Sequence, residues 1–267
     1  MSDYRHDYHI HTSFSMDSES RMEAACETAI ARGIDEIAFT DHLDFGPCDS
    51  SGAFPTDRYV AAIGRCRERY QGRLRVRTGI EVGEPHIFPR QAADVIARGD
   101  FDVVLGSVHY AEGMQAAWLE DFFDQPLRDA YEAYFSQVVD LAKEGDFDIL
   151  GHVDLVKRDA RKFGKAYDGP GPYGDMIRAA LKAVVERGKG IELNTSPLRR
   201  GQPEPCPSLE ILRWYRELGG ETLTLGSDAH LAEAVGSHLE VAVEMARAAG
   251  FTRLATFTHR EVDWKSI

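Results

Sequence analysis

The sequence predicts an α/β fold in which parallel strands and helices alternate and close into a barrel. Short apolar runs alternate with amphipathic helical windows along the chain, and most of the helical windows end at a glycine. No low-complexity tract or long linker interrupts this alternation. The length of 267 residues suits a barrel of one domain, which typically has about 250 residues. We therefore expect a single domain over residues 1–267.

The expected strands are short runs rich in apolar and β-branched residues. Strands that are buried on both faces read as such runs, and the Gly-rich stretches between them mark turns. The runs cover residues 8–11, 36–40, 74–80, 101–105, 147–150, 190–193 and 221–225, and residues 253–257 form a candidate final strand.

The expected helices fall between these runs. The first begins at a capping box formed by Ser20 and Glu23 and ends near Gly33. Pro89 suits the first turn of a helix, where its missing N–H has no partner to lose. The other windows cover residues 57–70, 126–144, 173–187, 208–218 and 233–249, and the Pro89 helix covers residues 89–98.

This alternation indicates parallel strands, because antiparallel neighbours need no helical crossover. Seven or eight strand–helix units favour a (β/α) barrel over the alternative, an open doubly wound sheet. No Gly-x-Gly-x-x-Gly motif follows the first run, so the usual dinucleotide fingerprint is missing.

Composition narrows the class of function. The chain carries 44 Asp and Glu against 31 Lys and Arg, a formal net charge of −13, which argues against a nucleic-acid partner. No Cys-x-x-Cys pair occurs among the four cysteines, so neither a zinc ribbon nor a redox dithiol is indicated. We find no signal peptide and no apolar stretch that could span a membrane, and we expect a cytoplasmic location without a membrane partner. The cysteines are Cys26, Cys48, Cys66 and Cys206.

Histidines and carboxylates gather where the predicted strands end. His9 and His11 alternate along the first strand, so both rings point to one side. In a barrel the carboxyl ends of the strands meet at one face, where active sites are built. The full set is His9, His11, His42, Glu81, His109, His152, Asp228 and His230.

This set exceeds what one ion needs and predicts a centre of two or three divalent ions. Imidazole and carboxylate ligands suit zinc, manganese or iron. Neighbouring ions need a bridging ligand, and Glu81 is the candidate for that role. The other four histidines lie outside the pattern and are expected to be structural or solvated: His6, His86, His238 and His259.

The arrangement resembles the PHP family, named for its polymerase and histidinol phosphatase members. The motifs extend from residue 9 to residue 230, so the resemblance covers most of the chain. They are His9-Ile10-His11, Asp41-His42, Gly79-Ile80-Glu81, Ser107-Val108-His109, Gly151-His152 and Ser227-Asp228-Ala229-His230. The resemblance implies a distorted (β/α)7 TIM-like barrel with a trinuclear metal site at the carboxyl ends of its strands.

The family's ligand pattern, transferred to matching positions, implies three groups of ligands. One metal would be held by His9, His11, Glu81 and Asp228, and a second by Glu81, His109 and His152. A third would be held by Asp17, His42 and His230. Many family members have histidine where this chain has Asp17, whose carboxylate also ligates such ions. The alternative for Asp17 is that it caps the first helix.

Within the family, the chain is most similar to bacterial monofunctional histidinol-phosphate phosphatases. The similarity rests on length and on segments such as residues 7–12, 41–45, 151–155 and 192–196. One departure is Pro197, where that group often has glycine, in a loop expected to touch substrate. The resemblance implies hydrolysis of L-histidinol phosphate to L-histidinol and phosphate, a step of histidine biosynthesis.

The implied reaction is attack of a metal-bound hydroxide on phosphorus, supported by Asp228, His230 and Glu81. A guanidinium fork matches phosphate oxygens, so Arg199 and Arg158 are the candidates for binding the phosphoryl group of a small phosphorylated substrate. The amino group of histidinol needs an acidic partner, and four residues are open for that role: Asp44, Glu112, Asp154 and Glu192.

Three other functions remain open at this stage. A PHP phosphoesterase could act on another substrate, such as a nucleotide, a phosphotyrosine peptide or a DNA 3′ end. A similar barrel could hydrolyse a non-phosphate bond, as amidohydrolases do. A non-catalytic metal-binding module would show missing ligands, whereas the ligand set here is complete.

Overall fold

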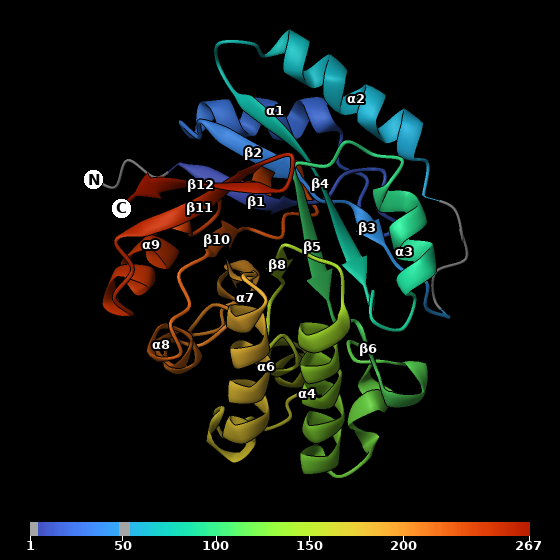
Figure 1. Cartoon of the computed structure of the whole chain (residues 1–267), viewed down its shortest axis with the longest axis vertical. Helices are drawn as coiled ribbons and strands as arrows, with labels where there is room; N and C mark the ends of the chain where they lie inside the picture. The colour runs from blue at the N-terminus through green and yellow to red at the C-terminus, as the bar shows by residue number, and fades with distance from the viewer. Residues whose placement is uncertain (1–4, 48–53) are drawn as a thin grey trace.

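The computed structural model describes residues 5–47 and 54–267, and it contains a barrel of parallel strands surrounded by helices (Figure 1). Seven parallel strands lie side by side in the order β1, β2, β4, β5, β8, β9, β10, and the two-residue strand β3 also pairs with β4. The strands are β1 (His6–Ile10), β2 (Glu36–Phe39), β3 (His42–Leu43), β4 (Arg75–Gly83), β5 (Val103–Ser107), β8 (Ile149–Leu150), β9 (Gly190–Asn194) and β10 (Leu223–Gly226).

The first and last strands of this series meet and close the barrel. A parallel bridge joins Ile10 to Ala229, and the His11 N–H donates to the Ala229 carbonyl at 2.9 Å. The predicted (β/α)7 barrel is therefore confirmed, and the open doubly wound alternative is wrong. The bridge also brings the segment after β1 beside the segment after β10, and both carry predicted metal ligands.

Helices cover the outer face of the strands. Their apolar sides pack on the sheet and form the main core, with residues such as Ile63, Phe135 and Leu181 fully buried. The helices are α1 (Met22–Ala31), α2 (Thr56–Arg69), α3 (Pro89–Ile96), α4 (Leu127–Glu144), α5 (Val156–Lys162), α6 (Gly174–Glu186), α7 (Ser196–Arg199), α8 (Leu209–Glu217) and α9 (Leu239–Ala248).

A hairpin formed by the last residues of the chain covers the end of the barrel opposite the predicted metal ligands. Strands β11 (Arg253–Thr258) and β12 (Glu261–Ser266) pair antiparallel with each other. The hairpin turn contacts the residue before β5, because the Arg260 N–H donates to the Asp102 carbonyl at 2.8 Å. Ala255 and Phe257 join a small apolar cluster with strand residues of the barrel such as Leu105. The candidate final strand thus exists, but it is not a barrel strand.

Two helix starts differ from the prediction. The residue before α1 is Arg21, and no side chain caps that helix, so the predicted capping box at Ser20 and Glu23 is wrong. The last helix begins at Leu239 and not at residue 233, because a short 3₁₀ turn (Ala232–Ala234) and a left-handed His238 (φ 60°) precede it. Pro89 does occupy the first turn of α3, as predicted.

Several short elements were not predicted. Helices α5 and α7 have seven and four residues, which is too short for a helical period to appear. A small hairpin of β6 (Tyr110–Ala111) and β7 (Gln115–Ala116) follows His109, and two 3₁₀ turns, Glu112–Met114 and Glu120–Asp124, lie near it. No helix in the described part of the chain has the length and apolar character needed to cross a membrane.

Candidate metal centre and active site

The structure brings all nine predicted metal ligands to the carboxyl end of the barrel. His9 lies in β1, His42 in β3 and Glu81 in β4, and the others follow β1, β5, β8 and β10 by a few residues. Because the strands are parallel, their carboxyl ends converge on one face. The remaining ligands brought to this face are His11, Asp17, His109, His152, Asp228 and His230.

Glu81 occupies the centre of the site, with histidines on both of its oxygen atoms. Its Oε2 atom lies 3.2 Å from Nε2 of His9 and 3.5 Å from Nε2 of His11. Its Oε1 atom lies 2.9 Å from Nε2 of His152 and 3.5 Å from Nε2 of His109. One carboxylate therefore separates two histidine pairs, which is the arrangement expected of a bridging ligand.

Asp228 completes the group around His9 and His11. Its Oδ1 atom lies 3.4 Å from Nε2 of His11 and 4.0 Å from Nε2 of His9. The Asp228 backbone is left-handed, with φ 52°, a conformation that aspartate tolerates better than most residues. Such backbone geometry is typical of residues that a functional site holds in place.

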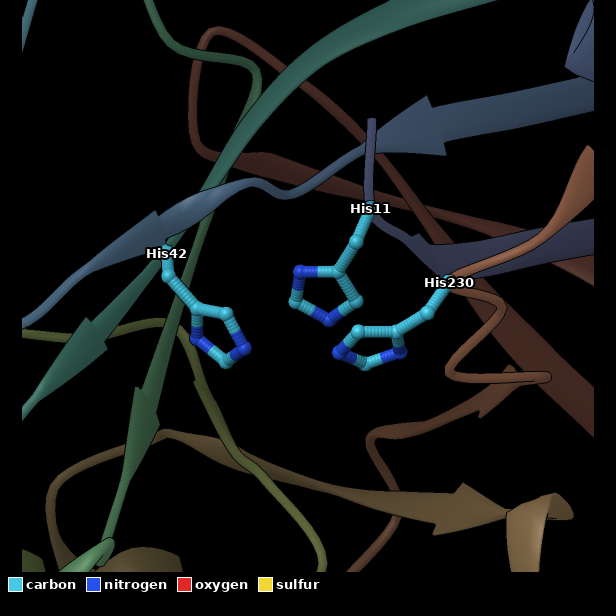
Figure 2. A group of neighbouring side chains, drawn as sticks. All are labelled: His11, His42 and His230. Atoms are coloured by element: carbon cyan, nitrogen blue, oxygen red, sulfur yellow. The ribbon is translucent and has the colours of Figure 1, made fainter. Parts of the chain in front are cut away.

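Asp17 lies with the two histidines of the third group. Its Oδ2 atom is 2.9 Å from Nε2 of His230 and 3.7 Å from Nε2 of His42. The alternative that Asp17 caps the first helix is wrong, because α1 begins at Met22. Figure 2 shows the rings of His42 and His230 on either side of the His11 ring, and each ring centroid is 4.2 Å from that of His11.

The nitrogen and oxygen atoms that these side chains direct into the site suit divalent metal ions. Within residues 5–47 and 54–267, Nε2 of His9, Nε2 of His11 and Oε2 of Glu81 are buried without a hydrogen-bond partner. Leaving buried polar atoms unsatisfied costs free energy, and a cation among them would satisfy all three. Four overlapping groups of His, Asp and Glu have their donor atoms within 4.8 Å of one another. The mixture of imidazole and carboxylate suits zinc, manganese or iron.

Charge and burial shift the pKa of the clustered groups in both directions. Burial alone would lower the pKa of His9, His42 and His109, but the neighbouring carboxylates raise it well above its usual value. Burial alone would raise the pKa of the Glu81 carboxyl, but His9, His42 and His109 hold it well below its usual range. Burial and the neighbouring His230 and His42 rings lower the pKa of His11 well below its usual value. An ionised carboxylate and a neutral imidazole are the forms that bind metal.

A carboxylate outside the centre orients two of the ligands. Nδ1 of His9 lies 2.6 Å from Oε1 of Glu192, and the backbone N–H of His152 donates to Oε2 of Glu192 at 3.0 Å. This contact at Nδ1 leaves Nε2 of His9 facing the centre. Such outer partners fix the tautomer and the direction of a ligating histidine.

Asp44 and Ser15 have the same role for other ligands. Oδ1 of Asp44 lies 2.9 Å from Nδ1 of His109, and Oγ of Ser15 lies 3.2 Å from Nδ1 of His11. Ser15 is itself held by Asp41, whose Oδ1 accepts its hydroxyl at 2.7 Å. The Asp41-His42 motif therefore supports the site through its aspartate.

Both predicted arginines reach the centre through Asp228. Nη1 of Arg158 lies 3.3 Å from Oδ2 of Asp228 and also bonds the Ser196 hydroxyl at 3.2 Å. Arg199 bonds the backbone carbonyls of Ser227 and Asp228, the latter at 2.9 Å. Arg158 lies in α5 and Arg199 ends α7. Their guanidinium groups thus lie on one side of the predicted metal centre.

A cavity of about 610 Å³ opens above the ligands. Its volume lies in the range of small-molecule sites. Arg158 and Arg199 lie on its wall together with residues that were not predicted, among them Trp118 and Leu155. The Trp118 ring stands edge-on to the His109 ring, with centroids 6.2 Å apart. A small phosphorylated molecule therefore has room between the metal centre and an apolar wall.

Comparison with known proteins agrees with the ligand pattern. The model of the PHP domain matches residues 7–196, most of the chain. This chain belongs to the PHP family. A probable histidinol-phosphatase of Clostridium acetobutylicum is 30% identical over 246 residues, which cover 90% of this chain and 92% of the relative. The histidinol-phosphatase of Lactococcus lactis is 28% identical over 96% of both chains.

A solved PHP structure shares the fold along nearly the whole length. It is the L. lactis histidinol phosphate phosphatase in complex with zinc, L-histidinol and phosphate. The two chains superpose with a TM-score of 0.88 at 27% identity, over 97% of this chain and 98% of the other. The predicted membership of the PHP family and the predicted barrel are both confirmed.

Sequence reasoning missed a buried glutamate beside His109. Glu84 follows β4 and is fully buried, and its Oε1 accepts the backbone N–H groups of His109 at 2.5 Å and of Tyr110 at 2.9 Å. Burial raises its pKa to about 7. The sequence signal that could have identified Glu84 is its position three residues after Glu81, because Glu84 also follows the end of a strand. Trp118 lies in a connecting segment and gave no periodic signal.

The acidic candidates for the substrate amine have other partners. Glu192 bonds His9, Asp44 bonds His109, and Asp154 pairs with Lys157, with Oδ2 and Nζ 2.8 Å apart. The side chain of Glu112 lies outside what the structure describes. Of these three residues, Asp44 lies on the cavity wall and stays a candidate for the substrate amine, whereas Asp154 and Glu192 do not line the cavity.

Proposed function

We propose that this protein is a metal-dependent phosphomonoesterase that hydrolyses L-histidinol phosphate to L-histidinol and phosphate. The observation that carries the proposal is the bridging position of Glu81 between two histidine pairs, beside a cavity whose wall bears Arg158 and Arg199. The similarity to the L. lactis enzyme, which was solved with zinc, L-histidinol and phosphate, supports this substrate.

The proposed ligands fall into three groups, and the first two share Glu81. His9, His11, Glu81 and Asp228 hold one ion, and Glu81, His109 and His152 hold a second. Asp17, His42 and His230 hold a third. When bound, such ions lower the pKa of a coordinated water toward neutrality and offset the charge of the phosphoryl oxygens. Zinc, manganese and iron all suit these ligands.

The arginines would hold the phosphoryl group against this centre. The guanidinium group of Arg199 lies beside that of Arg158, because both contact the Asp228 residue. Planar guanidinium groups bind phosphate oxygens through parallel N–H bonds and carry their charge at every working pH. Holding the phosphoryl group in one orientation removes much of the entropic cost of reaching the transition state.

Asp228, His230 and Glu81 would support the reaction at the edge of the cavity. His230 is about a third exposed, with 30% of its side chain accessible, so it can meet a substrate from the solvent side. Asp228 is itself a predicted metal ligand and contacts both phosphate-binding arginines. Pro197, where related enzymes often have glycine, occupies the first turn of α7, and this turn ends at Arg199.

The apolar wall around Trp118 and Leu155 would accept the ring of the substrate. An imidazole stacks or packs edge-on against an indole, and burial of both surfaces stabilises the complex. This arrangement places the phosphoryl group at the metal centre and the ring toward Trp118, so one cavity holds both ends of the substrate.

Phosphate release by the purified, metal-loaded protein tests this function. L-histidinol phosphate is compared with nucleotides, sugar phosphates and p-nitrophenyl phosphate. We expect kcat/KM for L-histidinol phosphate to exceed the others by orders of magnitude. Similar slow rates on every compound would leave a PHP phosphoesterase of another substrate, and absence of phosphate release would contradict the proposal.

A further inference from the structure

A lysine that the proposed reaction does not use is buried beside the site. The side chain of Lys157 is 0% exposed. Its ammonium has three N–H donors, and three acceptors surround it: Oδ2 of Asp154 at 2.8 Å, Oε1 of Glu204 at 3.2 Å and the Pro205 carbonyl at 2.8 Å. Each donor therefore has a partner, as a buried cation requires.

Lys157 connects two segments that are distant in sequence. It lies in α5, whereas Glu204 and Pro205 lie in the segment between α7 and α8. Two further bonds join the same segments. Nε2 of Gln202 donates to the Arg158 carbonyl at 2.8 Å, and the Ser208 N–H donates to Oδ2 of Asp154 at 3.2 Å. The lysine thus belongs to a set of contacts that fixes α5 against residues 202–208.

One of the phosphate-binding arginines lies in α5, and the other lies just before residues 202–208. Arg158 follows Lys157 directly, and Arg199 ends α7, shortly before the segment that Lys157 binds. The two guanidinium groups meet at Asp228, through its side chain and its backbone carbonyl. A shift of α5 relative to residues 202–208 would therefore change the spacing of the two arginines.

We propose that Lys157 is a positioning residue that holds Arg158 at a fixed distance from Arg199 and thereby sets the affinity for the phosphoryl group. This inference rests on the proposed function. It explains why the chain buries a charge that touches neither the metal ligands nor the cavity wall. A buried charge is costly unless its geometry is fixed, and the same fixed geometry serves the neighbouring arginine.

The decisive variant is the double substitution Asp154→Asn with Lys157→Met. Lys157→Met alone leaves the Asp154 carboxylate buried without its cation, which is strongly destabilising. The double variant removes both charges, so the net charge of the protein stays the same, and the asparagine can still accept the Ser208 N–H. Lys182→Met, at an exposed position of α6, is the matched control.

The first readout is equilibrium binding of inorganic phosphate to the metal-loaded protein, measured by calorimetry. We expect the double variant to bind phosphate about tenfold more weakly than the wild type, the cost of one misplaced charged contact. We expect KM for L-histidinol phosphate to rise more than kcat falls. Metal content and the Lys182→Met control should match the wild type.

The outcomes separate this inference from the function on which it rests. A folded double variant with wild-type phosphate affinity and KM would overturn the positioning role and leave the phosphatase intact. A wild-type protein that binds no phosphate would overturn both. If circular dichroism shows that the double variant does not fold, Glu204→Ala replaces it in the phosphate-binding measurement. Glu204 is partly exposed, so its loss should be tolerated by the fold. Unchanged phosphate affinity in Glu204→Ala would then reject the inference.

Discussion

Nδ1 of His9 lies 2.6 Å from Oε1 of Glu192, and both side chains are fully buried. The contact fixes the ring so that Nε2 faces Glu81, 3.2 Å away. Glu192 also accepts the backbone N–H of His152 at 3.0 Å. One carboxylate outside the centre therefore orients predicted ligands from β1 and from the loop after β8.

We expect Glu192→Gln to weaken zinc binding by about 10- to 100-fold, because the amide has one acceptor oxygen and cannot serve both Nδ1 of His9 and the His152 N–H. Competition with a chromogenic chelator measures the affinity. Glu210→Gln, at an exposed position in the first turn of α8, is the control. An affinity within about twofold of the wild type would show that Glu192 does not orient the ligands.

Asp17 is expected to hold an ion together with His42 and His230. We expect Asp17→Ala to lose about one equivalent of metal per chain after dialysis, and Asp17→His to retain it, since imidazole and carboxylate both ligate these ions. Inductively coupled plasma mass spectrometry counts the ions. Glu19→Ala removes an exposed acid two residues away and should change nothing. Full occupancy in Asp17→Ala would contradict the assignment.

Gly226 is expected to be intolerant of any side chain. A Cβ atom there would lie 2.1 Å from Oε1 of Glu192 and 2.4 Å from Cβ of His9. We expect Gly226→Ala to lower the free energy of unfolding by about 1–3 kcal/mol, as overpacking does, and to weaken metal binding. Gly64 in α2 has no atom within 4 Å of an added Cβ, so Gly64→Ala should stabilise by about 0.5–1 kcal/mol.

Urea unfolding of both glycine variants measures these changes. A Gly226→Ala protein as stable as the wild type would mean that Glu192 and His9 can move apart. That result would contradict a rigid geometry of the centre.

His6 is expected to make stability depend on pH. Burial lowers the pKa of His6 from 6.5 to about 4. Between these two values the unfolded chain binds a proton that the folded chain does not, so the free energy of unfolding falls as the pH drops from 6.5 to 4. The loss is on the order of 3 kcal/mol, from about 1.4 kcal/mol for each pKa unit.

The difference between wild type and His6→Gln isolates this effect from other titrating groups. Urea unfolding at several pH values should show a smaller loss of stability on acidification in the variant. Parallel stability curves for the two proteins from pH 7 to pH 4 would contradict a depressed pKa at His6.

The sequence predicted the barrel and the ligand positions because both depend on local patterns. Apolar runs such as residues 101–105 are buried on both faces, and chemistry-bearing residues such as His152 follow them at once. Parallel connectivity then places all of these residues on one face. No contact between particular residues had to be known for that inference.

The supporting residues could not be predicted, because they depend on contacts between distant segments. The sequence offers Glu192 as a partner for the substrate amine, whereas in the structure its Oε1 lies 2.6 Å from Nδ1 of His9, a residue 183 positions earlier. No sequence pattern distinguishes Lys157, because its acceptors come from residues 154, 204 and 205. The hairpin of β11 and β12 breaks the strand–helix pattern, so its first strand, β11, could only be read as another barrel candidate.

Metal removal tests the central claim most directly. Phosphate release from L-histidinol phosphate is measured on one preparation as purified, after chelation, and after addition of zinc or manganese, with the metal content counted each time. We expect activity to disappear with the ions and to return with them, and we expect the His109→Ala variant to regain little activity when metal is added. A metal-free protein that hydrolyses the substrate at the original rate would contradict the account.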